Sequence, residues 1–84
     1  MITVLYFARL REVLGTGSEQ IALPQGVRDL DGLLALLVAR GGAWAAELAG
    51  NKALRAAVNQ NMASGDAPVA DGDEVAFFPP VTGG

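Results

Sequence analysis

The sequence predicts one α+β domain in which a mixed sheet of about five strands packs on one main helix. Residues 2–7 and 74–78 are rich in β-branched and aromatic side chains, and leucines at helical spacing lie between them. With 84 residues, of which 51% are hydrophobic, the chain suits a single small core. We assign residues 1–80 to this domain and residues 81–84 to an extended tail.

The first predicted strand covers residues 2–7. Side chains alternate along a strand, so Tyr6 faces the core while Leu5 and Phe7 face away from it. Four further elements are expected before the last strand, besides the main helix described below. Two come before that helix: a short helix at 9–14 ending at Gly15, and a second strand at 19–23 closed by Pro24. Two come after it: a helical turn or two at 44–49, and a third strand at 54–59 followed by a turn at 60–61 and a short extended piece near Met62.

The main helix is predicted from one apolar stripe on a 3.6-residue period. Its members are Leu30, Leu33, Leu34, Leu37 and Val38. Asp29 or Gly26 is the candidate cap at its start, and the glycine pair at 41–42 is expected to end it. Gly32 inside the helix costs about 1 kcal/mol relative to alanine, and the sequence offers no reason for it. We interpret the stripe as a core face.

The last strand, residues 74–78, is expected to lie parallel to the first at the centre of the sheet, with the helix across one face. Phe77 then points into the core, and Phe78 joins Leu5 and Phe7 on the face that the helix leaves uncovered. Exposed apolar side chains gathered in this way predict a docking surface. The plainer alternative is that Phe78 folds over the edge of the core or is a lone exposed aromatic.

The end of the chain combines a diproline with two terminal glycines. Proline lacks an N–H, so Pro79 and Pro80 stop sheet pairing and hold the chain extended beyond the last strand. Gly83 and Gly84 carry no side chain and can pass through a channel only as wide as a backbone. A frayed terminus is the ordinary alternative. Together with a stiff spacer and a docking face, the glycines instead predict a functional tail.

Composition excludes several classes of function. The chain has no histidine and no cysteine, so imidazole bases, thiolate nucleophiles and ordinary zinc sites are ruled out. A net charge of −3 argues against a nucleic-acid partner, because such partners require clustered cations. No signal peptide or membrane segment is apparent, and a domain without disulfides suits a reducing compartment. We therefore expect a cytoplasmic protein that binds no metal and no permanent cofactor.

Three segments of the sequence together form a recognisable set of motifs: FARLRE at residues 7–12, AVNQ at 57–60 and DGDEVAFFPPVTGG at 71–84. Together they resemble the small subunits of molybdopterin synthase, a family of ubiquitin-like sulfur carriers. The similarity spans nearly the whole chain, whereas residues 27–52 match only in pattern. The third segment is the most specific of the three. The resemblance implies a β-grasp (ubiquitin-like) fold, which agrees with the element order expected above.

The resemblance also implies a chemical role for the terminus. The carboxylate of Gly84 would be adenylated with ATP by a ubiquitin-activating-type adenylyltransferase and then converted to a thiocarboxylate. The loaded tail, Val81, Thr82, Gly83 and Gly84, would enter the large subunit and give its sulfur to a pterin precursor. Two loaded carriers would be consumed per product, in an assembly of two small and two large subunits. Phe7, Phe78, Pro79 and Pro80 correspond to the family's docking region, and alternation adds Leu5. The chain would then supply sulfur without catalytic side chains of its own.

Three other interpretations stay open on sequence alone. A sulfur carrier of another pathway, such as thiamine synthesis, would also end in two glycines. A ubiquitin-like modifier would join Gly84 to lysines of target proteins, starting from the same acyl-adenylate. The third alternative is an interaction domain whose tail has no role. Genomic neighbourhood would distinguish the first alternative, and a search for branched Gly-Gly remnants on lysines would reveal the second.

Overall fold

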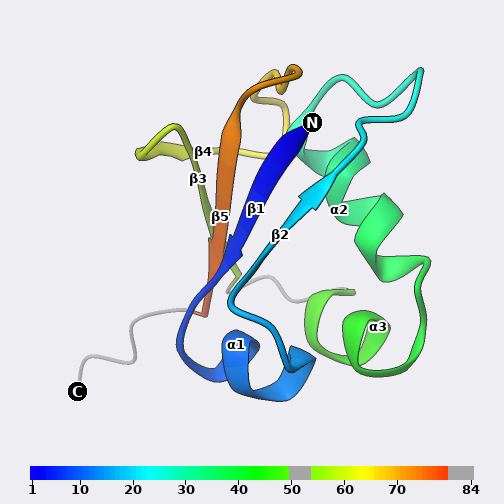
Figure 1. Cartoon of the computed structure of the whole chain (residues 1–84), viewed down its shortest axis with the longest axis vertical. Helices are drawn as coiled ribbons and strands as arrows, with labels where there is room; N and C mark the ends of the chain where they lie inside the picture. Colours follow the sequence, from blue (N-terminus) through cyan, green and yellow to red (C-terminus); the bar gives the residue numbers. More distant parts are fainter. Residues whose placement is uncertain (50–53, 80–84) are drawn as a thin grey trace.

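The computed structural model describes residues 1–49 and 54–79, which form a five-stranded mixed sheet with helices on one side (Figure 1). The strand order is β2-β1-β5-β3-β4. The elements in chain order are β1 (Ile2–Tyr6), α1 (Ala8–Leu14), β2 (Ser18–Ile21), α2 (Leu30–Val38), α3 (Gly42–Leu48), β3 (Arg55–Val58), β4 (Asn61–Ala63) and β5 (Glu74–Phe78). This is the predicted α+β architecture, with its first and last strands central and adjacent.

The register of the two central strands confirms the predicted alternation. β1 and β5 run parallel, with Val4 opposite Val75 and Tyr6 opposite Phe77. These four side chains are at most 1% exposed, because they face the helices and fill the core. The intervening residues face the other way, and the strand burial patterns alternate accordingly. Phe77 is therefore a core residue, as predicted.

Helix α2 supplies the other side of the core and begins at a side-chain cap. The carboxylate Oδ1 of Asp29 accepts a hydrogen bond of 2.8 Å from the backbone N–H of Gly32. Leu33 and Leu37 are fully buried. The cap also explains Gly32, because a Cβ there would lie 3.2 Å from Asp29 Oδ1 and 3.4 Å from Val27 Cγ1. Any larger residue at position 32 would crowd the cap, and avoiding that contact offsets the low helix propensity of glycine.

Several predicted boundaries move by a few residues. The second strand ends at Ile21 rather than at residue 23, and α2 ends at Val38, before the glycine pair, of which Gly42 begins α3. The hairpin turn lies at Asn59 and Gln60, one residue earlier than expected. Both have positive φ, 49° and 70°. Such a turn matches the twist of the strands that it joins, and asparagine tolerates the left-handed conformation well.

Candidate functional site

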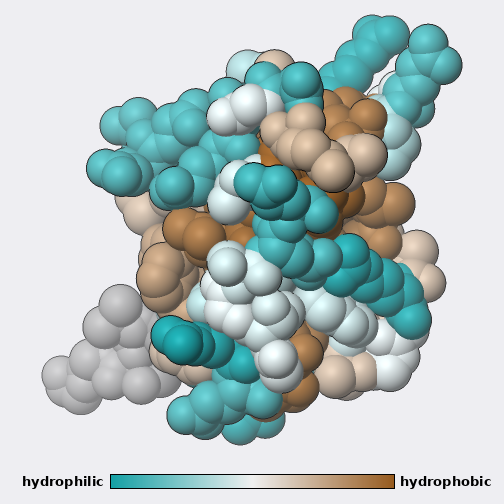
Figure 2. Space-filling model, viewed as in Figure 1, coloured by the Kyte–Doolittle hydropathy of each residue, from teal (hydrophilic) through white to brown (hydrophobic). Residues whose placement is uncertain are grey.

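The face of the sheet away from α2 carries a group of apolar side chains at the predicted docking position. The pairing registers place Leu5 opposite Ala76, Ala57 opposite Ala76, and Ala57 opposite Met62, so these residues share that face. Phe78 lies on it two residues beyond Ala76. We call the following set the outer patch: Leu5, Phe7, Ala57, Met62, Ala76 and Phe78. Figure 2 shows apolar surface on the side of the molecule where β3 and β5 lie.

Exposure within the outer patch is unusual for large apolar side chains. Phe7 is 47% exposed and Met62 is 64% exposed, whereas Leu5 and Phe78 are half-buried. Between these larger groups lie the two alanines of the patch, on the neighbouring strands β3 and β5, of which Ala57 is only 7% exposed. Apolar surface gathered across several strands is typical of a protein–protein contact. The structure thus confirms the outward placement of Leu5, Phe7 and Phe78.

The backbone around Phe7 is held by the adjacent strand. Its N–H donates to the carbonyl oxygen of Phe77 at 3.2 Å, which extends the β1–β5 pairing one residue past the end of β1. The next residue, Ala8, then turns the chain into α1 with a φ of 52°. A non-glycine residue in this conformation costs on the order of 1 kcal/mol or more, so the surrounding structure must hold it there. Phe7 therefore projects from a tightly determined turn.

Behind the patch, a network of polar and aromatic groups anchors the end of β1. The Tyr6 ring stacks on Phe77 with centroids 6.4 Å apart and meets Trp44 edge-on at 5.3 Å. Its hydroxyl donates to Glu19 Oε2 at 2.8 Å. Arg40 binds both carboxylate oxygens of Glu19, at 2.8 and 2.9 Å, and its guanidinium lies 4.5 Å from the Trp44 ring centroid. This network joins β1 and β2 to the helices next to the exposed Phe7.

These contacts shift the proton affinity of two of the groups. Hydrogen bonds from Arg40 lower the pKa of the Glu19 carboxyl below its ordinary value, and the Tyr6 hydroxyl contributes further. Burial raises the pKa of the Tyr6 hydroxyl, and the hydrogen bond to the Glu19 carboxylate raises it more. Tyr6 therefore remains a neutral donor while Glu19 remains charged at neutral pH.

We expect Glu19→Gln to lower the free energy of unfolding by about 1 kcal/mol at pH 7. A carboxyl whose pKa is lowered by folding stabilises the fold above its unfolded-state pKa, and that stabilisation is lost as the pH falls through the folded-state pKa. The difference between wild type and variant should therefore shrink below about pH 4.5, the ordinary value for this group. Denaturant unfolding at pH 7 and pH 3 measures it. Glu12→Gln, at an exposed position on α1, is the control, and an equal loss from it would contradict the assignment.

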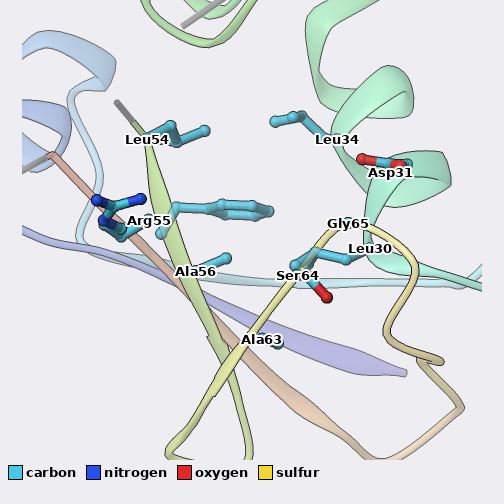
Figure 3. A pocket seen from close by; sticks show the side chains of 10 residues that line it. Leu30, Asp31, Leu34, Leu54, Arg55, Ala56, Ala63, Ser64 and Gly65 are labelled. Carbon is cyan, nitrogen blue, oxygen red and sulfur yellow. The ribbon is translucent and has the colours of Figure 1, made fainter. Parts of the chain in front are cut away.

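A pocket of about 300 Å³ lies on the opposite side of the sheet, between α2 and β3–β4 (Figure 3). Leu30, Leu34, Leu54, Ala56 and Ala63 supply most of its apolar lining, and Asp31, Arg55 and Ser64 supply polar groups. No histidine, cysteine or second acidic side chain lines it. The pocket therefore lacks a pair of groups suited to acid–base or nucleophilic catalysis.

Residues 1–49 and 54–79 contain neither a metal-binding cluster nor a membrane-spanning helix. No group of three acidic residues is placed to hold a metal ion. In the same ranges, the helices lack the length and hydropathy needed to cross a bilayer.

The predicted site residues fall into two groups. Leu5, Phe7 and Phe78 come together on the outer patch, and Pro79 follows directly at the end of β5. The remaining predictions, Pro80, Val81, Thr82, Gly83 and Gly84, lie outside the described residues. Met62 was missed, although it is the most exposed large apolar side chain of the patch. Its signal was the hairpin register, which places it beside Ala57 once the turn is correctly set at 59–60.

Comparisons with known proteins agree on one family. The model of the ThiS family matches residues 4–84. A molybdopterin synthase sulfur carrier subunit of Escherichia coli (strain K12) is 48% identical over 84 residues, covering 100% of both chains. A putative molybdopterin converting factor, subunit 1, of Pyrococcus furiosus is 35% identical with a TM-score of 0.78, over 95% of this chain and 97% of that one. The small archaeal modifier protein 1 of Haloferax volcanii is 27% identical with a TM-score of 0.80, over 95% and 97%.

Proposed function

Because the chain belongs to the ThiS family, and within it to the molybdopterin synthase sulfur carrier subunits, we propose that the terminal carboxylate of Gly84 carries the sulfur. The observation that supports this most directly is the position of the outer patch. It surrounds the end of β5, and five residues, 80–84, follow the last described residue, Pro79. A partner bound on the patch would therefore receive the terminus.

A carboxylate needs activation before sulfur can replace one of its oxygens. In the proposed sequence, an oxygen of the Gly84 carboxylate attacks the α-phosphorus of ATP on an adenylyltransferase, and pyrophosphate leaves. A hydrosulfide equivalent from a sulfur donor then attacks the carbonyl carbon and displaces AMP, which leaves a thiocarboxylate. The sequence contains no cysteine, so no thiol of this chain competes for the activated carbonyl. ATP is thus a co-substrate of the activating enzyme and not a ligand of this domain.

The thiocarboxylate is proposed to act within a complex with the synthase large subunit. That partner would bind the outer patch and enclose residues 81–84, bringing the sulfur to a pterin precursor held by the large subunit. Once the sulfur is bonded to the precursor, water would cleave the acyl–sulfur bond, so the carrier would leave with a carboxylate once more. Two carriers are needed for the two sulfurs of a dithiolene, which favours an assembly of two small and two large subunits. In such an assembly, the carrier contributes the reacting group and the large subunit contributes the catalytic side chains.

Intact mass spectrometry on protein from cells that synthesise molybdopterin, the pterin of the molybdenum cofactor, tests this function. Exchange of one oxygen for sulfur changes the mass almost as oxidation does, and Met1 and Met62 are 60% and 64% exposed and open to oxidation. The sample is therefore alkylated with a reagent selective for thiocarboxylates before measurement. We expect a tagged species whose label maps to the peptide ending at Gly84. It should be absent from cells lacking the adenylyltransferase, and a tag at another position would contradict the proposal.

A further inference from the structure

The outer face carries charge at only two strand positions, which lie at opposite ends of the adjacent strands β5 and β3. By the pairing registers, its strand residues are Thr3, Leu5, Ser18, Gln20, Arg55, Ala57, Met62, Glu74, Ala76 and Phe78. Glu74 begins β5, where its N–H donates to Asn59 Oδ1 at 3.0 Å and its carbonyl oxygen accepts from the Asn59 N–H at 2.8 Å. Arg55 begins β3 and pairs with Phe78, the last residue of β5. Arg55 is therefore the cation of this face that lies beside the aromatic part of the patch.

Arg55 differs from the arginines that stabilise the fold. Arg9 is paired with Glu47 and Arg40 with Glu19. Within residues 1–49 and 54–79, Arg55 makes no ion pair or side-chain hydrogen bond, and the residue is exposed. Arg55 also borders the pocket beside α2, but Figure 3 shows its guanidinium across β3 from Leu34 and Asp31, and its pairing with Phe78 places it on the outer face. The position thus contributes a charge without a partner among the described residues.

We infer that the protein that docks on the outer patch presents a carboxylate to Arg55. This inference rests on the proposed function, because it assigns the chemistry of the same docking partner. A protein seated over Phe78 also partly covers the neighbouring exposed guanidinium at the edge of the contact, where an acceptor on the partner replaces the water that is displaced. A carboxylate satisfies a guanidinium with two parallel charge-assisted hydrogen bonds. An apolar contact at Phe78 fixes the position of docking, and a charged contact at the next strand fixes its rotation.

Association kinetics with the large subunit test this inference. Paired charges at the rim of an interface act mainly on the association rate constant and are weakened by salt. We expect Arg55→Glu to slow association by about tenfold at low ionic strength, and Arg55→Gln to slow it by about threefold. Both effects should shrink when the salt concentration is raised to about 1 M, where the screening length is about 3 Å.

Arg28→Glu is the matched control. It changes the net charge by the same amount at an exposed position in the connection leading into α2, and we expect less than a twofold change. Equal effects from Arg55→Glu and Arg28→Glu would overturn the inference, since only the overall field would then matter. If Arg55→Glu fails to fold, the salt dependence of Arg55→Gln decides the question.

Phe78→Ala separates this inference from the function on which it rests. If Phe78→Ala weakens binding while both Arg55 variants bind like wild type, the charged contact is wrong and the docking surface stands. If Phe78→Ala also binds like wild type, the docking surface itself is wrong.

Discussion

Deleting Gly84, or adding one residue after it, is expected to abolish sulfur transfer while leaving the free energy of unfolding unchanged. Either change moves the reacting carboxylate by about 3.3 Å along the chain, and a misplacement of about 1 Å can cost on the order of 100-fold in rate. The core residues of the described domain lie between Ile2 and Phe77, and each keeps its side chain. Thiocarboxylate formation with the adenylyltransferase and denaturant unfolding of the same samples measure the two effects.

Thr82→Ser is the control, because it changes one of the last residues without moving the terminal carboxylate along the chain. It keeps the number of residues and the carboxylate of Gly84, so thiocarboxylate formation should remain within a few-fold of wild type. A shortened chain that still forms product at the normal rate would contradict the proposal that the terminal carboxylate is the reacting group. A shortened chain that unfolds more easily would show that residue 84 also stabilises the domain.

The parts of the fold that were predicted well are those that depend on local patterns. The alternation in β5 separates Phe77 from Phe78, and the leucine spacing in α2 selects Leu33 and Leu37, both fully buried. The cap at Asp29 was one of two candidates, and the structure selects it by a single hydrogen bond. Each of these features involves residues a few positions apart, where periodicity and capping preferences are informative.

The features that were not predicted depend on contacts between distant residues. Glu19 and Arg40 are 21 residues apart, and neither has a local pattern that identifies the other as its partner. Met62 joins the outer patch only through its pairing with Ala57 across a turn whose position was misplaced by one residue. A shift of one residue moves a side chain to the other face of a sheet. The face on which a residue of a short strand such as β4 lies is therefore hard to predict from the sequence.

The fold itself does not distinguish a sulfur carrier from a protein modifier. This chain shares its architecture with the small archaeal modifier protein 1 as well as with a molybdopterin converting factor subunit. Under the proposed function, an activated terminal carboxylate could serve either role, so the difference lies in whether a sulfur donor or a lysine of a target protein reacts with it. Identity of 48% along the full length of a molybdopterin synthase sulfur carrier subunit favours the carrier. The docking surface is the feature on which the two roles should differ.

Replacing Phe77 and Phe78 one at a time by alanine should therefore produce opposite effects. Phe77 is 1% exposed and stacks on Tyr6, so Phe77→Ala should lower the free energy of unfolding by about 3–5 kcal/mol. A domain of this size has little stability in excess of that loss, so much of the protein should be unfolded. Phe78 is half-buried on the outer patch, and Phe78→Ala should cost the fold about 1 kcal/mol. It should instead weaken large-subunit binding by about 2 kcal/mol, or roughly 30-fold in Kd.

Two further variants make the comparison independent of the family's sequence motif. Met62→Ala truncates an exposed side chain on another strand of the same patch, so it should weaken binding with little loss of stability. Val13→Ala truncates an apolar side chain that is 39% exposed on α1, outside the patch, and should leave binding unchanged. Titrations with the large subunit beside denaturant unfolding of all four variants give the result. If Phe78→Ala unfolds the domain while Phe77→Ala spares it, the register of β5 is wrong by one residue. If Val13→Ala weakens binding as much as Met62→Ala, truncation on the outer patch harms binding no more than truncation on α1. That result would contradict the assignment of the outer patch as the docking surface.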